Sequence, residues 1–146
     1  MNKLVSLRGY EPTQQTKWSA GFDVKARWTR YIAPKSTVLI PTGVKVAMDL
    51  WTVCLVFIRS SLPLKRWLML ANWVWVVDAD YRWEIWIQIY NSNDHEVKIE
   101  DMERIWQLVF TKYSDNNYEC DSEMFDTREE KFPTKRWTGW FGSTGN

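Results

Sequence analysis

Residues 104–110, RIWQLVF, decide the fold class, because apolar and polar side chains alternate along most of this stretch. A period of two turns one face of a strand toward a core and the other toward solvent. Four further runs have strand length and either alternate or are continuously apolar: 38–40, 44–48, 53–58 and 85–89. No long stretch carries a helical stripe, although residues 60–66 suit a short helix. The sequence therefore predicts an all-β domain.

Composition and charge set broad limits on function. A chain of 146 residues suits one domain. Its net charge of +1 gives no sign of a nucleic-acid or membrane surface. The longest apolar run, residues 51–58, is far shorter than the roughly 18 residues of a membrane helix. The first residues, MNKLV, lack a signal-peptide core. We therefore expect a cytoplasmic protein with no nucleic-acid and no membrane partner.

Cysteine and histidine are too few for several kinds of site. Cys54 and Cys120 are not arranged as a CxxC pair, and His95 is the only histidine. A zinc cluster, a disulfide framework and a histidine-dependent triad are therefore excluded as interpretations.

The C-terminal part of the chain differs in composition from the rest. Residues 114–134 are polar and acidic and suit a linker, whereas residues 134–146 are rich in Gly, Ser and Thr. We expect a β-domain over residues 1–133 and a mobile arm over residues 134–146. Glycines that alternate with hydroxyls beside Arg136 can wrap a phosphate with backbone N–H groups.

Each short polar block has an ordinary interpretation when it is taken alone. AGFD (20–23) suits a turn, RSSL (59–62) a helix cap, and DADY (78–81) a charged turn. Arg104 and Gln107 suit solvated strand positions.

Taken together and in order, five blocks resemble the five motifs of the trimeric dUTPase family. They are AGFD (20–23), RSSL (59–62), NWVWVVDADYRWEI (72–85), RIWQLVF (104–110) and RWTGWFGSTG (136–145). The resemblance spans nearly the whole chain, and five ordered motifs are far more specific than any one of them. It implies a distorted jelly-roll β-barrel that assembles as a homotrimer, with active sites shared between subunits. The implied function is dUTP diphosphatase, which hydrolyses dUTP to dUMP and pyrophosphate.

The same resemblance implies how the nucleoside is recognised. Asn72 and the backbone of a hairpin around Val76 and Val77 would recognise the edge of uracil. Tyr81 would lie under the deoxyribose and leave no room for a 2′-hydroxyl. Phe141 of the arm would close over the uracil.

The remaining roles concern the triphosphate and its metal. Asp78 is implied as the general base that activates the attacking water. The residues implied on the α- and β-phosphates are Arg59, Ser60, Ser61 and Gln107, and those on the γ-phosphate are Arg136, Ser143 and Thr144. Mg²⁺ would bind chiefly to phosphate oxygens and water, with Asp23 in its outer shell. Asp80 and Arg104 stay open between a structural role and a ligand contact.

Tryptophan stands where the family pattern has glycine. The sequence has 11 Trp and only 6 Gly. Family patterns favour glycine at positions 73, 75, 83, 137 and 140, often also at 18, 51 and 67, and a small residue at 106, whereas Trp28 and Trp86 are less diagnostic. An altered genetic code, in which UGA means glycine, explains this pattern. We call the chain with glycine at every tryptophan position the glycine-restored chain, and we expect the printed chain to be a poor enzyme.

Three other interpretations compete with this one. A dCTP deaminase shares the RSSL-like and QLVF-like blocks, but DADY and the arm argue against it. A non-catalytic, nucleotide-binding regulator would not require Asp78. An aromatic-rich β-sandwich that stacks on sugars or bases would take the tryptophans literally, but it leaves the five ordered blocks unexplained.

Overall fold

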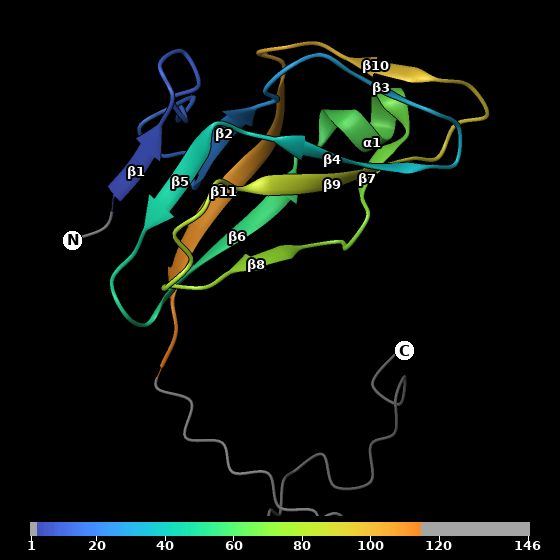
Figure 1. Ribbon diagram of the computed structural model, residues 1–146. Helices are drawn as coiled ribbons and strands as arrows, with labels where there is room; N and C mark the ends of the chain where they lie inside the picture. The colour runs from blue at the N-terminus through green and yellow to red at the C-terminus, as the bar shows by residue number, and fades with distance from the viewer. Residues whose placement is uncertain (1–2, 115–146) are drawn as a thin grey trace, which may run out of the picture. The chain divides into compact units, whose positions relative to one another are not determined.

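The computed structural model describes residues 3–114, and this part of the chain forms 11 short strands and one helix (Figure 1). The strands are β1 (Lys3–Ser6), β2 (Gly21–Lys25), β3 (Arg30–Ile32), β4 (Thr37–Pro41), β5 (Val44–Ala47), β6 (Thr52–Ile58), β7 (Leu68–Leu70), β8 (Trp75–Val77), β9 (Trp86–Asn91), β10 (Val97–Ile99) and β11 (Arg104–Lys112). The helix α1 spans Ser61–Arg66. The helix found in this part of the chain is too short to cross a membrane.

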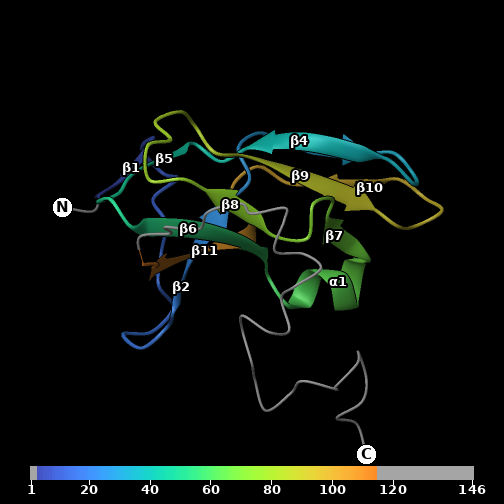
Figure 2. The same ribbon diagram turned by 90° about the horizontal axis from the view of Figure 1, so that it is seen from below.

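The strands pair antiparallel in four sheets. The largest has the order β2-β11-β6-β8, and a second has the order β4-β9-β7. Two-stranded pairs β1-β5 and β10-β3 complete the set. Figure 2 shows the β4–β9 pair lying above the β6–β11 pair, so that the two larger sheets face each other. Apolar side chains from both sheets fill the space between them.

The core follows from the alternation in the sequence. In β9, Ile87 and Ile89 are fully buried while Gln88 between them is exposed. In β6, Cys54 and Val56 are fully buried on the same face of the strand. Burial raises the pKa of the Cys54 thiol to about 12, so this cysteine is a core residue and not a reactive thiol.

The structure confirms the strands and the helix predicted from the sequence, but it does not show the predicted hairpin. The five predicted strands correspond to β4, β5, β6, β9 and β11, and the predicted helix corresponds to α1. The segment expected to form a hairpin around β8 differs. β8 pairs with β6, and the residues that follow it, 78–85, form no strand. Side-chain hydrogen bonds, together with a few backbone hydrogen bonds at Tyr81 and Ile85, hold that segment in place.

Tryptophan occupies unusual backbone positions in this fold. Six non-glycine residues of the described part have positive φ, and four of them are Trp28 (70°), Trp51 (63°), Trp67 (53°) and Trp73 (63°). A left-handed conformation costs a residue with a side chain roughly 1–2 kcal/mol relative to glycine. Trp67 ends α1 in this conformation, a place where glycine is usual. The family pattern alone gives little indication of glycine at Trp28, but the positive φ shows that the backbone there also favours glycine.

A buried asparagine links three segments of the fold. The Asn91 side chain is fully buried at the end of β9. Its amide nitrogen donates to the carbonyl oxygens of Ile32 (2.9 Å), Ala33 (3.2 Å) and His95 (2.8 Å). Its oxygen accepts from the backbone N–H (3.0 Å) and the side-chain amide (2.8 Å) of Asn93. One side chain thus satisfies backbone groups at the end of β3 and in the loop that follows β9.

We predict that Asn91→Ala lowers the free energy of unfolding by about 2–4 kcal/mol, because several buried polar groups lose their partner at once. Chemical denaturation of the variant and the parent measures this difference. Gln88→Ala, at an exposed position of the same strand, is the matched control and should change stability by less than about 0.5 kcal/mol. Equal losses for the two variants would contradict the role assigned to Asn91.

Candidate active site

Two arginines converge on one buried carboxylate. Asp23, in β2, is 7% exposed, and its Oδ2 lies 3.5 Å from Arg59 Nε and 3.5 Å from Arg104 Nη1. This oxygen accepts no hydrogen bond from the described residues. Arg59 Nη1 also donates to the backbone oxygen of Arg104 at 3.1 Å. Asp23 therefore holds two partly exposed guanidinium groups side by side, where they can face an anion. We call Asp23, Arg59, Arg104 and the adjacent Gln107 the Asp23 cluster.

Strand pairing explains why these residues meet. β11 lies between β2 and β6, and Gln107 is opposite Asp23 on one side and Phe57 on the other. Arg59 directly follows β6, and its backbone N–H donates to the oxygen of Ile105 at 3.0 Å. The ladder thus continues one residue beyond the strand and fixes the start of the Arg59 side chain.

Ser60 and Ser61 follow Arg59 at the beginning of α1. Both are exposed, and Ser60 is the N-cap residue, but its hydroxyl makes no capping hydrogen bond. Ser60 thus stands at the N-cap position, with helical φ and ψ of −53° and −29°, but the side-chain cap suggested by the RSSL block is not formed. The hydroxyl is left available to a ligand beside Arg59.

Gly21 is required by close packing against Gln107. A Cβ atom at position 21 would lie 2.7 Å from Gln107 Oε1 and 3.3 Å from its Cβ. The absence of a side chain at Gly21 therefore lets the Gln107 amide lie against β2.

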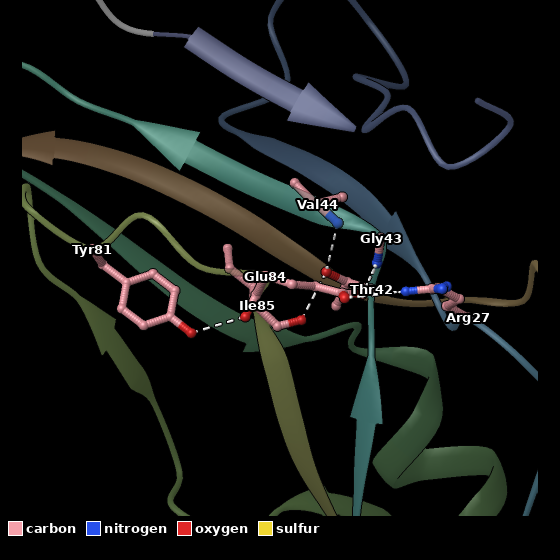
Figure 3. A network of polar contacts seen from close by, with 7 residues as sticks. All are labelled: Arg27, Thr42, Gly43, Val44, Tyr81, Glu84 and Ile85. Carbon is pink, nitrogen blue, oxygen red and sulfur yellow. Dashed lines mark hydrogen bonds and ion pairs between the residues drawn. The ribbon is translucent and has the colours of Figure 1, made fainter. Parts of the chain in front are cut away.

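A second group of residues follows β8. Asp78 is exposed, and its carboxylate has no hydrogen-bond partner within residues 3–114. The Tyr81 backbone N–H donates to the backbone oxygen of Asp78 at 3.1 Å, which closes a turn. The Tyr81 hydroxyl donates to the backbone oxygen of Glu84 at 2.8 Å (Figure 3). Burial, together with the nearby Glu84 carboxylate, raises the pKa of Tyr81, so its hydroxyl stays protonated at neutral pH. We call residues 78–85 the Tyr81 loop.

The segment before and within β8 carries the residues expected to recognise a base. Asn72 is exposed in the turn after β7, and its carbonyl accepts from Val74 N–H at 2.7 Å. Val76 is 55% exposed, whereas Val77 is 2% exposed and faces the core. Val77 can therefore contribute to a ligand site only through its backbone. Trp73, next to Asn72, is 87% exposed and has positive φ.

One chain holds the Asp23 cluster and Asp78 far apart. Val77 is opposite Cys54 in the β6–β8 ladder, which places Asp78 level with Val53. Arg59 follows the other end of β6. Six residues of strand at about 3.3 Å each separate the two groups by about 20 Å. In Figure 1 the end of β6 that leads to α1 lies opposite the end of β8 that leads to the Tyr81 loop. A single copy of residues 3–114 therefore presents two separate groups of candidate residues.

The expected arm residues lie outside the described part of the chain. They are Arg136, Phe141, Ser143 and Thr144. The boundary at residue 133 lies outside it as well.

The donor set fits a metal only in a limited way. No three Asp, Glu, His or Cys side chains of residues 3–114 gather as a metal cage would require. Asp23, expected in the outer shell of Mg²⁺, has its Oδ2 between two guanidinium groups. A carboxylate neutralised in this way suits a contact through water better than direct coordination. The residues therefore fit Mg²⁺ that is held mainly by a ligand's own phosphate oxygens.

Some residues of the site escaped the sequence analysis. The ion pair between Arg27 and Glu84, with an N–O distance of 3.1 Å, joins segments 57 residues apart. Glu84 lies within the third block, but nothing in the sequence connects it to Arg27. Arg104 pairs with Asp23 and is also partly exposed, so both a structural role and a ligand contact stay open for it. For Asp80, exposed in the turn, the question stays open.

Comparison with known proteins gives one consistent result. A family model described as dUTPase matches residues 9–145. The chain is 38% identical to the deoxyuridine 5′-triphosphate nucleotidohydrolase of Lactococcus lactis, over 97% of this chain and 99% of the relative. It is 35% identical to that of Fusobacterium nucleatum, over 98% and 95%.

Comparison with solved structures also finds dUTPases. The dUTPase from Streptococcus mutans has a TM-score of 0.74 at 32% identity, covering 80% of this chain and 98% of that one. A Staphylococcus bacteriophage 80alpha dUTPase mutant solved with dUpNHpp has a TM-score of 0.83 over 100% of this chain and 99% of that one. At 22% identity this second likeness concerns the fold alone.

We predict that Gly21→Ala displaces the Gln107 amide and leaves the fold intact. The new methyl group meets the far end of a flexible side chain, so the amide moves and β2 stays in place. A crystal structure of the variant should show the amide turned away from Asp23, with a stability loss below about 1 kcal/mol. Ala20→Ser, one residue earlier and exposed, is the control and should leave Gln107 unmoved. An unmoved Gln107 in Gly21→Ala would contradict the packing argument.

Proposed function

The chain belongs to the dUTPase family and is a deoxyuridine triphosphate nucleotidohydrolase, and from this premise we propose which residues perform the reaction and how copies of the chain share them. The reaction breaks the bond between the α-phosphorus of dUTP and the bridging oxygen to the β-phosphate. Water supplies the new oxygen on phosphorus, and dUMP and pyrophosphate are released.

Asp78 is the proposed general base. Its carboxylate is exposed and has no hydrogen-bond partner among the described residues, and the turn to Tyr81 fixes its backbone. A carboxylate that is free of partners can accept a proton from water as the water oxygen attacks the α-phosphorus.

The Asp23 cluster is the proposed site for the α- and β-phosphates. Arg59 lies just beyond β6, and Gln107 lies in the neighbouring β11 opposite Asp23. Ser60 and Ser61 follow Arg59 with exposed hydroxyls. Guanidinium, amide and hydroxyl donors stabilise phosphate oxygens and the charge that develops on the pyrophosphate leaving group. Arg136, Ser143 and Thr144 of the arm are proposed for the γ-phosphate.

Mg²⁺ is the proposed cofactor, held by the triphosphate and water, with Asp23 in the outer shell. When bound, it would neutralise charge on the phosphate oxygens. Asp23 then has a second role that the structure supports directly, which is to orient Arg59 and Arg104.

Nucleoside recognition is proposed for the other group. Asn72 and the backbone at Val76 and Val77 would bind the uracil edge, and Phe141 would cover the base. Tyr81 would lie against the deoxyribose, and its ring is held by the hydrogen bond to Glu84. Because this bond fixes the ring, a sugar with an additional 2′-hydroxyl would meet a surface that cannot retreat.

A homotrimer with shared active sites is the proposed assembly, and the 20 Å separation along β6 supports it. Asp78 must reach the α-phosphorus, while the Asp23 cluster must hold phosphates bonded to it. Residues about 20 Å apart in one chain cannot both contact a triphosphate, whereas Asp78 of one copy and the Asp23 cluster of another can. The arm, from residue 134 on, is proposed to complete the site.

We predict that Asp78→Asn in the glycine-restored chain lowers kcat for dUTP by at least about 10²-fold and leaves dUTP binding within a few-fold of the parent. The amide keeps the shape of the carboxylate but cannot take the proton. Mg²⁺-dependent pyrophosphate release measures kcat, and calorimetry with a non-hydrolysable dUTP analogue measures binding. Asp80→Asn, two residues away and also exposed, is the matched comparison. A turnover in Asp78→Asn close to that of the parent would remove Asp78 from the role of base.

We also predict that the glycine-restored chain is a trimer and that removal of residues 134–146 abolishes turnover without changing the trimer. Light scattering gives the mass of the assembly, and pyrophosphate release gives the activity. A fully active, truncated monomer would contradict the shared-site proposal.

A further inference from the structure

Glu84 connects the Tyr81 loop to the rest of the barrel. One carboxylate oxygen accepts from the Gly43 backbone N–H at 2.7 Å, and Arg27 Nη1 donates to both oxygens at 3.2 and 3.1 Å (Figure 3). The ion pair is mostly buried, with side-chain exposures of 24% for Arg27 and 20% for Glu84. Such a pair is screened less by solvent than an exposed one, and it fixes the Glu84 side chain.

The backbone beside Glu84 is fixed as well. The next residue, Ile85, donates its N–H to the Val44 oxygen at 2.9 Å. Its carbonyl accepts from the Thr42 N–H (3.2 Å) and the Thr42 hydroxyl (2.9 Å), and Thr42 is fully buried. The carbonyl of Glu84, which accepts the Tyr81 hydroxyl, is therefore held from both its own side chain and its neighbour.

We propose that Glu84 is a positioning residue for sugar selection: the Arg27–Glu84–Gly43 contacts hold the Tyr81 ring in the place from which it excludes ribonucleotides. Glu84 touches no reacting atom in this account. It acts through the carbonyl that orients Tyr81. The proposal rests on the sugar-contacting role proposed above for Tyr81.

The test measures the ratio of kcat/KM for UTP to kcat/KM for dUTP, with the melting temperature recorded for each variant of the glycine-restored chain. Glu84→Ala should raise this ratio at least tenfold, because the ring gains freedom to make room for the 2′-hydroxyl. Tyr81→Phe removes only the hydroxyl that donates to the Glu84 carbonyl, and it should raise the ratio by a similar factor. The double variant should exceed neither single variant by more than about twofold, because both changes break one connection.

Controls separate positioning from stability and from the role of Tyr81 itself. Glu100→Ala removes an exposed ion pair with Lys98 and should leave the ratio unchanged. A lower melting temperature in Glu84→Ala with an unchanged ratio, or effects that multiply in the double variant, would overturn the proposal. Tyr81→Ala tests the premise separately: if its ratio equals that of the parent, Tyr81 does not select the sugar and the proposed recognition itself fails.

A second inference rests on the backbone and is independent of the first. Four of the nine tryptophans within residues 3–114 have positive φ. Only six non-glycine residues in this part of the chain have positive φ, and a random choice of six residues would include fewer than one tryptophan. None of the four side chains lies in the core. The exposures are 44% for Trp28, 45% for Trp51, 64% for Trp67 and 87% for Trp73.

We infer that the protein made by its source carries glycine at positions 28, 51, 67 and 73, encoded by UGA codons that are read as glycine. Glycine adopts positive φ without a steric penalty, whereas tryptophan has neither the small size nor the local hydrogen bonding that lets Asn or Asp do so. Position 106 is a different case, because the Trp106 ring is fully buried, although its indole N–H has no partner in the described part. Shared codon use would make position 106 glycine too, and backbone strain does not require it.

Peptide mass spectrometry of the protein from its natural source tests this inference position by position. Glycine at the four positions is expected, and tryptophan at them would overturn it.

A stability comparison gives a second readout that does not depend on the source. Each tryptophan is replaced in turn by Gly and by Ala, so that both changes remove the ring. At positions 28, 51, 67 and 73 the Gly variant should have a folding equilibrium constant about 5- to 30-fold larger than the Ala variant. At Trp18 and Trp83, which are exposed and do not have positive φ, Gly should give no such advantage. An Ala variant as stable as the Gly variant at all four positions would contradict the backbone argument.

Discussion

The pairing of β11 with β2 on one side and β6 on the other is the constraint on which the rest of the structure depends. It aligns Asp23 with Gln107 and brings Arg59, just past β6, beside Arg104. Because a shift of one residue turns every side chain of a strand to the other face, the buried residues of β11 hold this register and thereby the phosphate donors. The core and the proposed phosphate site are thus set by the same hydrogen-bonded ladder.

The same ladder accounts for the proposed division of labour between subunits. β6 carries the proposed phosphate donors at one end and, through β8, the Asp78 carboxylate at the other. The length of this strand is the observation that supports the proposal of sites shared between copies. In an enzyme built as proposed, activity would depend on assembly.

The sequence predicted the strands that show a clear periodicity, but it did not predict the features that depend on contacts between distant segments. The runs 85–89 and 105–110 were recognisable because alternation reports which face is buried. Three-residue strands such as β3 and β10 are too short to show a period. The Arg27–Glu84 pair joins segments 57 residues apart, and the positive φ of Trp28 depends on the path of the surrounding chain. The motifs supplied the candidate residues, and the strand register showed that those within residues 3–114 fall into two groups.

Subunit complementation tests the shared-site account most directly. Glycine-restored chains carrying either Arg59→Ala or Asp78→Asn would be purified, shown to be inactive alone, and then unfolded and refolded together in equal amounts. If each site takes Arg59 from one subunit and Asp78 from another, about a quarter of the sites in randomly mixed trimers regain both residues, and turnover should return to about that fraction of the parent. Mixed trimers that form and remain as inactive as either variant alone would show that both residues act within one chain, and the account would be contradicted.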